Sequence, residues 1–293
     1  MSQRPSSAVK DTEAVVVRLL IAGEEPTRRI AIQEVGPESA SEVLLCLPGL
    51  LETHESFSGL QKELGQDHRL FILDHAGRGD SDPMKEASHY RMSRYLSDIG
   101  VALAYVQGRM ASSARPSSLF RESRPSPRLH LVGTSMGGIL AMSIAAQQPA
   151  GLASVVLNDV ACLLPWAGIF GLMTGLGAAT KGAALFGNHR EVAEDLQIDP
   201  RLLRAVQQPK HLDIVHQTTM HGVDFRETFS QVTQPVLLIK AGQSDVVNDQ
   251  AIEATRRCNP LGETLVVPEA RHPAPYDAQV CQAIRRFVGA ITV

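Results

Sequence analysis

The sequence predicts a doubly wound α/β fold, the α/β-sandwich type in which helices cover a mostly parallel eight-stranded sheet. A helical cap is expected to be inserted after the sixth strand. Residues 43–47 and 69–74 are continuous apolar runs that end in turn residues, as interior strands of a parallel sheet do. Strand-like and helix-like segments then alternate along the chain, except between residues 161 and 224. We therefore expect a core of residues 1–160 and 225–293 and a cap of residues 161–224.

The first half of the chain is expected to contain a hairpin, the two interior strands and two helices. β-rich runs predict paired strands at residues 14–22 and 28–35, which the turn sequence GEEPT separates. A helix is expected at residues 56–64, between the two apolar runs. Residues 90–110 place apolar side chains at helical spacing, which predicts a long amphipathic helix.

Residues 111–128 differ from their surroundings. Their sequence, ASSARPSSLFRESRPSPR, is rich in serine, proline and arginine and has almost nothing to bury. A segment of this composition cannot bury enough apolar surface to offset the entropy lost on ordering. We expect a disordered surface insertion, either an idle loop or, alternatively, a docking or phosphorylation segment.

The second half of the chain resumes the alternation. A strand is expected at residues 154–159, and two more at residues 235–240 and 263–267 after the cap. Helices are expected at residues 249–257 and 278–288.

Composition and charge restrict the class of partner. The formal net charge is −3 and the basic residues are scattered, which argues against a nucleic-acid binder and favours a small-molecule substrate. The four cysteines lack metal-ligand spacing, so no metal and no cofactor are expected, and several fall in apolar runs, which fits a reducing, cytoplasmic location. The first residues lack the apolar core of a secretory signal. The sequence carries no indication of oligomeric state.

Residues 161–180 are long enough to cross a bilayer and contain no charge. They are also rich in glycine, contain Pro165 and lack clear basic flanks of the kind that orient a span. The segment follows a predicted core strand, so we interpret it as a lid over the site rather than as a stable membrane span.

The chain is organised around residues 129–146, LHLVGTSMGGILAMSIAA, where an apolar strand leads through a tight turn into a helix. The turn from Gly133 to Gly137 is a G-x-S-x-G sequence with Ser135 at its tip. In this setting it is typical of a nucleophile elbow, in which the glycines permit a sharp turn that exposes the serine.

A nucleophilic serine needs a base to remove its proton and an acid to orient that base. His272 follows one predicted strand by five residues, and Asp245 follows the preceding strand by five residues. Because such strand ends meet at one edge of a parallel sheet, we expect both beside Ser135. Asp159, at the end of the sixth strand, is a rival for the role of the acid.

These motifs together resemble the α/β-hydrolase superfamily of esterases, lipases and C–C hydrolases. The order serine, acid, histidine is the order found in that family. The sequence LPGL at residues 47–50 stands where its members usually have His-Gly-x, and DHAGRGDS at residues 74–81 resembles their D-x-x-G-x-G-x-S turn. The resemblance covers the chain from about Val43 to the C-terminus.

The resemblance implies an oxyanion hole made by the backbone N–H groups of Leu50 and Met136. It also assigns His75 to the second turn and not to catalysis. Pro48 stands where a histidine is frequent, which leaves the amide of Leu50 available but removes a side chain that often braces the loop. Arg271 stands where a glycine often precedes the catalytic histidine, which restricts positive φ in that loop.

The substrate pocket is less specifically marked in the sequence. Apolar residues near the expected site either line a cavity beneath the cap or pack in the core: Leu50, Leu51, Phe57, Met136, Trp166, Phe170 and Met173. We see no arginine placed to bind a substrate carboxylate, which favours an uncharged substrate.

The sequence therefore favours a serine hydrolase that cleaves an ester-type bond of a small, largely apolar molecule through an acyl-enzyme on Ser135. C–C bond hydrolysis or acyl transfer by the same triad is one alternative. A non-catalytic ligand receptor with this fold is another.

Overall fold

The computed structural model describes residues 16–22, 28–114, 126–172, 174, 193–206, 211–214 and 216–291. Within them an eight-stranded sheet has the strand order β1-β2-β4-β3-β5-β6-β10-β11. The strands are β1 (Val16–Ala22), β2 (Arg28–Val35), β3 (Glu42–Leu47), β4 (Arg69–Leu73), β5 (Arg128–Thr134), β6 (Leu152–Asn158), β10 (Val236–Ala241) and β11 (Glu263–Val267).

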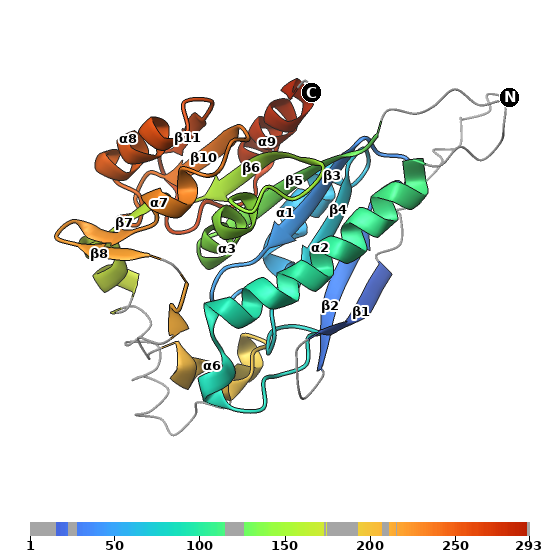
Figure 1. The fold of residues 1–293 in the computed structure, drawn as a ribbon, viewed down its shortest axis with the longest axis horizontal. Coiled ribbons are helices and arrows are strands. Elements are labelled where there is room, and N and C mark those ends of the chain that lie inside the picture. The colour runs from blue at the N-terminus through green and yellow to red at the C-terminus, as the bar shows by residue number, and fades with distance from the viewer. Residues whose placement is uncertain are drawn as a thin grey trace, which may run out of the picture.

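Only the first two strands depart from parallel pairing. β1 and β2 form an antiparallel hairpin, and β2 pairs antiparallel with β4. The strands from β4 to β11 across the sheet are parallel to one another. The predicted mostly parallel, eight-stranded sheet is therefore confirmed (Figure 1).

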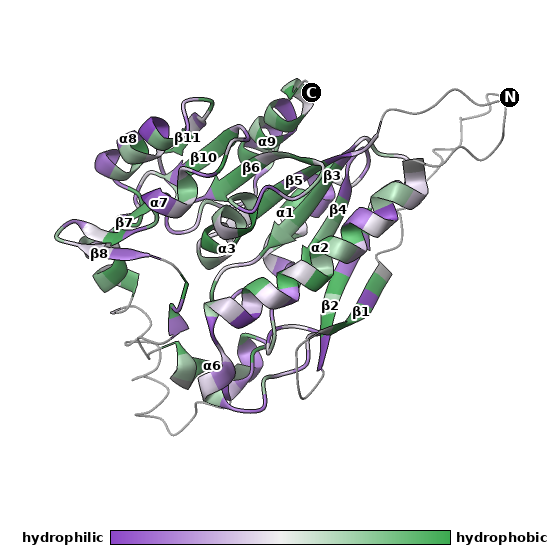
Figure 2. Cartoon of the chain, in the orientation of Figure 1, coloured by the Kyte–Doolittle hydropathy of each residue, from purple (hydrophilic) through white to green (hydrophobic). Residues whose placement is uncertain are grey.

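Two layers of helices cover the sheet, which explains why its interior strands are apolar on both faces. On one face a large apolar core includes residues of α2 (Met92–Ala114), α3 (Met136–Ala145) and α8 (Asp249–Cys258). On the other face a second core includes α1 (Ser58–Leu64) and α9 (Ala278–Ala290). Figure 2 shows the central strands as largely hydrophobic, whereas α8 also carries a hydrophilic side.

The expected insertion at residues 111–128 begins later than its composition suggested, because α2 continues to Ala114. The hydroxyls of Ser112 and Ser113 donate to the helix carbonyls of Gly108 and Arg109, which satisfies them without leaving the helix. The buried Arg69 also donates to the Ser113 hydroxyl and so anchors this last turn to the sheet. At the other end the strand β5 begins at Arg128, and residues 115–125 lie outside the described part of the chain.

After β6 the chain leaves the sheet and returns at β10, and we call residues 161–224 the insert. The insert was expected to be mostly helical, and the structure adds strands that were not predicted. A three-stranded antiparallel sheet forms from β7 (Leu163–Pro165), β9 (Gly222–Asp224) and β8 (Gln217–Thr219). Strands of three residues are too short to show a sequence periodicity, so only the contact between distant segments defines them.

The described helical parts of the insert are residues 166–172, the segment 193–195 and α6 (Pro200–Ala205). Among the residues described, no helix is both long enough and apolar enough to cross a membrane. The remaining short elements are η1 (His54–Phe57), η2 (Ala87–His89) and α7 (Arg226–Phe229).

Candidate active site

Ser135 lies at a sharp turn between β5 and α3. Its φ of 50° and ψ of −116° are strained for a residue with a side chain. The turn needs the two flanking glycines, because a Cβ on Gly133 would lie 2.5 Å from the Gly137 carbonyl oxygen, and a Cβ on Gly137 would lie 2.0 Å from the Leu47 carbonyl oxygen. The backbone geometry is that of a nucleophile elbow.

His272 lies on the loop after β11 and contacts the serine directly. Its Nε2 is 2.9 Å from Ser135 Oγ, and its Nδ1 is 2.8 Å from Asp159 Oδ2. With Nδ1–H donating to the carboxylate, Nε2 carries the lone pair that faces the serine hydroxyl. This arrangement allows the histidine to accept the serine proton.

Asp159 is fully buried at the end of β6, and its carboxylate is held from two sides. Oδ2 accepts from His272, and Oδ1 accepts from the backbone N–H of Ala241 at 3.0 Å. The Asp159 N–H in turn donates to the Ile239 carbonyl at 2.7 Å. The acid is thus fixed between the ends of β6 and β10, in position to orient the imidazole.

Asp245, the acid expected from the sequence, is not brought to His272. It is exposed, and within the described residues it makes no hydrogen bond or ion pair with the histidine. Both acids follow neighbouring strands, but Asp159 comes directly after β6 and fills the space at the strand ends. The loop after β10 instead turns toward the insert, where the Asp245 carbonyl lies close to Gly168.

The loop that follows β3 is held by three side chains. His75 Nε2 donates to the Pro48 carbonyl at 3.2 Å, and Arg78 Nε donates to the Leu50 carbonyl at 2.8 Å. The carboxylate of Glu52 accepts from the Gly49 N–H at 2.7 Å. In the part of the chain that the structure describes, the Leu50 N–H has no hydrogen-bond acceptor.

Burial changes the charge of the groups around this loop. It lowers the pKa of His75 to about 3, with the nearby Arg78 acting in the same direction, so this histidine is neutral. Burial also raises the pKa of Glu52 above its ordinary range, although the Gly49 N–H opposes the change. His75 and Arg78 both come from the turn at residues 74–81, so this turn supplies the bracing that Pro48 lacks. The contacts of Arg78 and Glu52 were not predicted from the sequence, in which the motif at residues 74–81 was the one available signal for Arg78.

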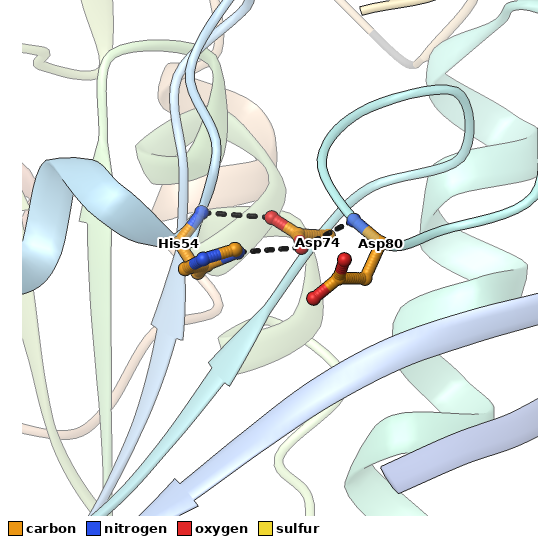
Figure 3. Close-up of side chains that lie close together, drawn as sticks. All are labelled: His54, Asp74 and Asp80. Carbon is orange, nitrogen blue, oxygen red and sulfur yellow. Dashed lines mark hydrogen bonds and ion pairs between the residues drawn. The ribbon is translucent and has the colours of Figure 1, made fainter. Parts of the chain in front are cut away.

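His54, Asp74 and Asp80 lie close together, with potential metal-ligand atoms within 4.8 Å of one another. Figure 3 shows that the Asp74 carboxylate accepts from the backbone and the ring of His54, both at 2.7 Å, and from the Asp80 N–H at 3.0 Å. Its oxygens and the His54 Nδ1 are already engaged with one another. We therefore assign this cluster a structural role, in which it joins the loop after β3 to the 74–81 turn.

The apolar pocket candidates are scattered over different environments. Leu50 and Leu51 are partly buried, whereas Phe57 is fully buried and stacks on Tyr276 in the core. Trp166 donates to the Thr219 carbonyl, which ties it to the small sheet of the insert.

Two further candidates give no support to a pocket in the described structure. Phe170 is 64% exposed, and Met173 lies outside the described residues. Of the predicted lining, Leu50 and Leu51 lie on the loop after β3, and Met136 is the first residue of α3, directly after Ser135.

Known proteins match both the sequence and the fold. The family model of the alpha/beta hydrolase fold matches residues 42–180. The 3-hydroxybutyrate-oligomer hydrolase of Cupriavidus necator is 24% identical, over 89% of this chain and 94% of that protein. N-formylmaleamate deformylase of Pseudomonas putida is 25% identical, over 80% of this chain and 83% of that protein.

A solved esterase structure from Rhodococcus sp. superposes with a TM-score of 0.66 at 17% identity, covering 94% of this chain and 99% of that one. The fold, the strand order around the elbow and these relatives lead to one conclusion. The chain has the alpha/beta hydrolase fold, and its similarity to named hydrolases and esterases supports an esterase-like hydrolase.

Proposed function

We propose that the protein is a serine hydrolase that cleaves an ester bond of a small, uncharged and largely apolar substrate through an acyl-enzyme on Ser135. The observation that carries the proposal is the continuous chain of hydrogen bonds from Ser135 Oγ through His272 to Asp159. This chain contains a nucleophile, a base and an orienting acid in contact.

In the first half-reaction, Ser135 Oγ attacks the ester carbonyl while its proton passes to His272 Nε2. The Asp159 carboxylate stabilises the resulting imidazolium. The tetrahedral intermediate collapses to an acyl-serine, and the alcohol leaves with the proton from Nε2. Water then attacks the acyl group with the same histidine as base, which releases the acid and restores the serine.

The negative oxygen of each tetrahedral intermediate needs fixed donors. We assign these to the backbone N–H groups of Leu50 and Met136. Two features support the assignment: the Leu50 N–H is without an acceptor among the described residues, and Met136 is the first residue of α3, where the helix dipole favours negative charge.

We also propose that the insert is a cap over this site. The backbone of residues 197–199 is hydrogen-bonded to the 74–81 turn, through Gly79 to Gln197 and Asp199 to Gly77. On the other side of the site, Gly168 of the insert packs against Asp245 in the loop after β10. The insert is therefore attached on two sides of the elbow, which suits it to enclose an acyl chain.

The relatives support ester chemistry. One is a hydrolase of 3-hydroxybutyrate oligomers, and a structural neighbour is an esterase. The preference for an uncharged substrate rests on the sequence alone, in which we see no arginine placed to bind a substrate carboxylate.

The test uses p-nitrophenyl butyrate as substrate and a fluorophosphonate probe as a label for the activated serine. The unmodified protein should hydrolyse the ester and be labelled, and both signals should disappear in Ser135→Ala. His272→Ala should retain the serine but be labelled far more slowly. Full ester hydrolysis by Ser135→Ala, or labelling that does not depend on His272, would overturn the proposal.

A further inference from the structure

Arg78 is a fully buried cation whose partners are all neutral. Its guanidinium donates to the carbonyls of Leu50 and Ala76, at 2.8 and 3.0 Å, and to the Tyr95 hydroxyl at 3.3 Å. It also lies over the Tyr95 ring, 4.8 Å from its centre, and its Nη2 is 4.0 Å from Met136 Sδ. Within the described residues it forms no ion pair with a carboxylate.

Such an arrangement is costly, because an arginine cannot lose its charge and a buried charge without a counter-ion loses most of its hydration. The same sheet shows the usual solution. Arg69 is equally buried and lies over an aromatic ring, that of Phe71, but it is paired with Glu34. Packing alone therefore does not explain why Arg78 is left without a negative partner.

The contacts of Arg78 fall on the two residues to which we assign the oxyanion hole. Through Nε it fixes the Leu50 carbonyl, and through Nη2 it touches the side chain of Met136. On the other side of the Gly49–Leu50 peptide, His75 and Glu52 fix the Pro48 carbonyl and the Gly49 N–H. The peptide that carries the Leu50 N–H is thus held from both ends.

The charge of Arg78 also lowers the pKa of two neighbouring histidines. Burial lowers the pKa of His75 to about 3 and that of His211 to about 4, and in both cases Arg78 is the next contributor. His75 and His211 are therefore neutral, and the guanidinium of Arg78 is left as a positive charge beside the loop after β3.

We propose that Arg78 is a positioning residue for the oxyanion hole: by holding the Leu50 carbonyl it fixes the peptide that follows the Gly49–Leu50 peptide and so helps to orient the Leu50 N–H. It also leaves its own charge unneutralised to favour the negative tetrahedral intermediate. The inference rests on the proposed function of Ser135. It predicts that Arg78 contributes to transition-state binding much more than to substrate binding.

The experiment compares Arg78→Met and Arg78→Lys with Arg69→Met and Arg69→Lys, the matched variants of a buried arginine that already has a counter-ion. For each, kcat and KM for p-nitrophenyl butyrate are measured per active site, titrated with the fluorophosphonate. The inhibition constant of an alkyl trifluoromethyl ketone, which forms a tetrahedral adduct with serine, is measured alongside the melting temperature.

We expect Arg78→Met to lower kcat by about 10²–10³-fold with a much smaller change in KM, the range observed when an oxyanion donor is lost. The ketone should bind weaker by a similar factor. Arg78→Lys keeps the positive charge but not the planar set of guanidinium N–H donors, so it should show a smaller loss of kcat than Arg78→Met. The Arg69 variants should lower the melting temperature and leave kcat per active site unchanged.

A loss of stability in the Arg78 variants with kcat and ketone binding within about threefold of the unmodified protein would overturn the proposal. An equal loss of kcat in the Arg69 variants would also overturn it. If Arg78→Met does not fold, the comparison of Arg78→Lys with Arg69→Lys decides on the same readouts. Failure of the proposed function is distinguishable, because the unmodified protein itself would then neither hydrolyse the ester nor react with the probe.

Discussion

Two buried arginines, one at each end of the parallel strands, hold their charge in opposite ways. At the amino-terminal edge, the basic side chains are paired with buried or partly buried carboxylates: Arg69 and Arg109 with Glu34, and Arg128 and His130 with Glu42. At the carboxyl-terminal edge, the partners of Arg78 within the described residues are all neutral, and Asp159 is turned toward a histidine that itself touches Ser135.

This contrast indicates that charged residues at one edge of the sheet contribute mainly to stability, whereas those beside Ser135 contribute mainly to the reaction. A charge that forms an ion pair in the resting protein stabilises the folded state. Removal of one partner of that pair therefore lowers the free energy of unfolding. A charge that lacks its complement in the resting protein can interact with the charge that develops during the reaction. Variants at the two edges should therefore fail in different assays.

The largest effect is expected for Asp159→Asn, which should lower kcat/KM for p-nitrophenyl butyrate by about 10³–10⁴-fold, because the amide no longer stabilises the histidine in the required tautomer. The melting temperature should change little, since the Asn oxygen can still accept from Ala241. Asp245→Asn is the matched control and should stay within about threefold. The reverse ranking of the two variants would return the role of the acid to Asp245.

At the opposite edge, Glu42→Gln should lower the free energy of unfolding in urea by about 3 kcal/mol at pH 7 and leave kcat/KM unchanged. Burial alone would raise the pKa of Glu42, but hydrogen bonds from His130 and Arg128 lower it to about 2. A depressed pKa stabilises the protein above the ordinary carboxyl value, near 4.5, and this contribution is lost as the pH falls toward 2.

The difference in free energy of unfolding between Glu42→Gln and the unmodified protein should therefore become smaller as the pH falls from about 4.5 to about 2. Glu263→Gln, which alters an exposed acid at the same edge, should change stability by less than about 0.5 kcal/mol. A loss of kcat/KM in Glu42→Gln would contradict the separation of the two edges.

A smaller change in stability is expected for Gly137→Ala, which should lower both the free energy of unfolding and the rate of ester hydrolysis. The added methyl group would lie 2.0 Å from the Leu47 carbonyl oxygen and 2.5 Å from that of Pro48. We expect the free energy of unfolding to fall by about 2 kcal/mol and kcat/KM to fall by at least about tenfold, because the elbow and the loop after β3 must move apart.

Gly100→Ala in α2 is the control for this variant, since no atom lies within 4 Å of the added methyl group. It should raise stability by up to about 1 kcal/mol without changing activity. Thermal unfolding and ester hydrolysis measured on both variants decide whether close packing at the elbow is required for catalysis.

The smallest effect is expected at His54, a paired charge at the catalytic edge. The hydrogen bond to Asp74 raises the pKa of His54, against the opposing effect of burial. A raised pKa stabilises the protein below the ordinary histidine value of 6.5, and this contribution is lost as the pH rises through the value in the folded protein.

His54→Gln should therefore destabilise the protein by up to about 1 kcal/mol at pH 6 and by less at pH 9, as measured by urea unfolding. His221→Gln, which alters an exposed histidine, should show no such dependence on pH. A difference that is constant from pH 6 to pH 9 would show that the charge of His54 adds nothing.

Local patterns predicted the parts of the fold that depend on neighbours in the chain. The apolar runs predicted the interior strands, and the G-x-S-x-G turn between a strand and a helix predicted the backbone of the elbow around Ser135. His272 was placed by its distance from the end of a strand, and the structure brings it to the serine.

The features that local patterns missed depend on segments far apart in the chain. The three-residue strands β7, β8 and β9 exist only through pairing with one another. The last turn of α2 is held by Arg69, which lies on a strand 44 residues away in sequence. Composition alone placed these residues in a loop, because it carries no information on such contacts.

Periodicity, glycine positions and strand ends are local properties, so the sequence was enough to predict the strands of the eight-stranded sheet, the elbow and the types of residue that meet at one edge. Only in the folded chain does Asp159 rather than Asp245 contact His272, and only there does Arg78 contact Leu50 and Met136 with no counter-ion among the described residues. Those outcomes depend on which loop fills the space between neighbouring strands, and on charges brought together from distant parts of the chain.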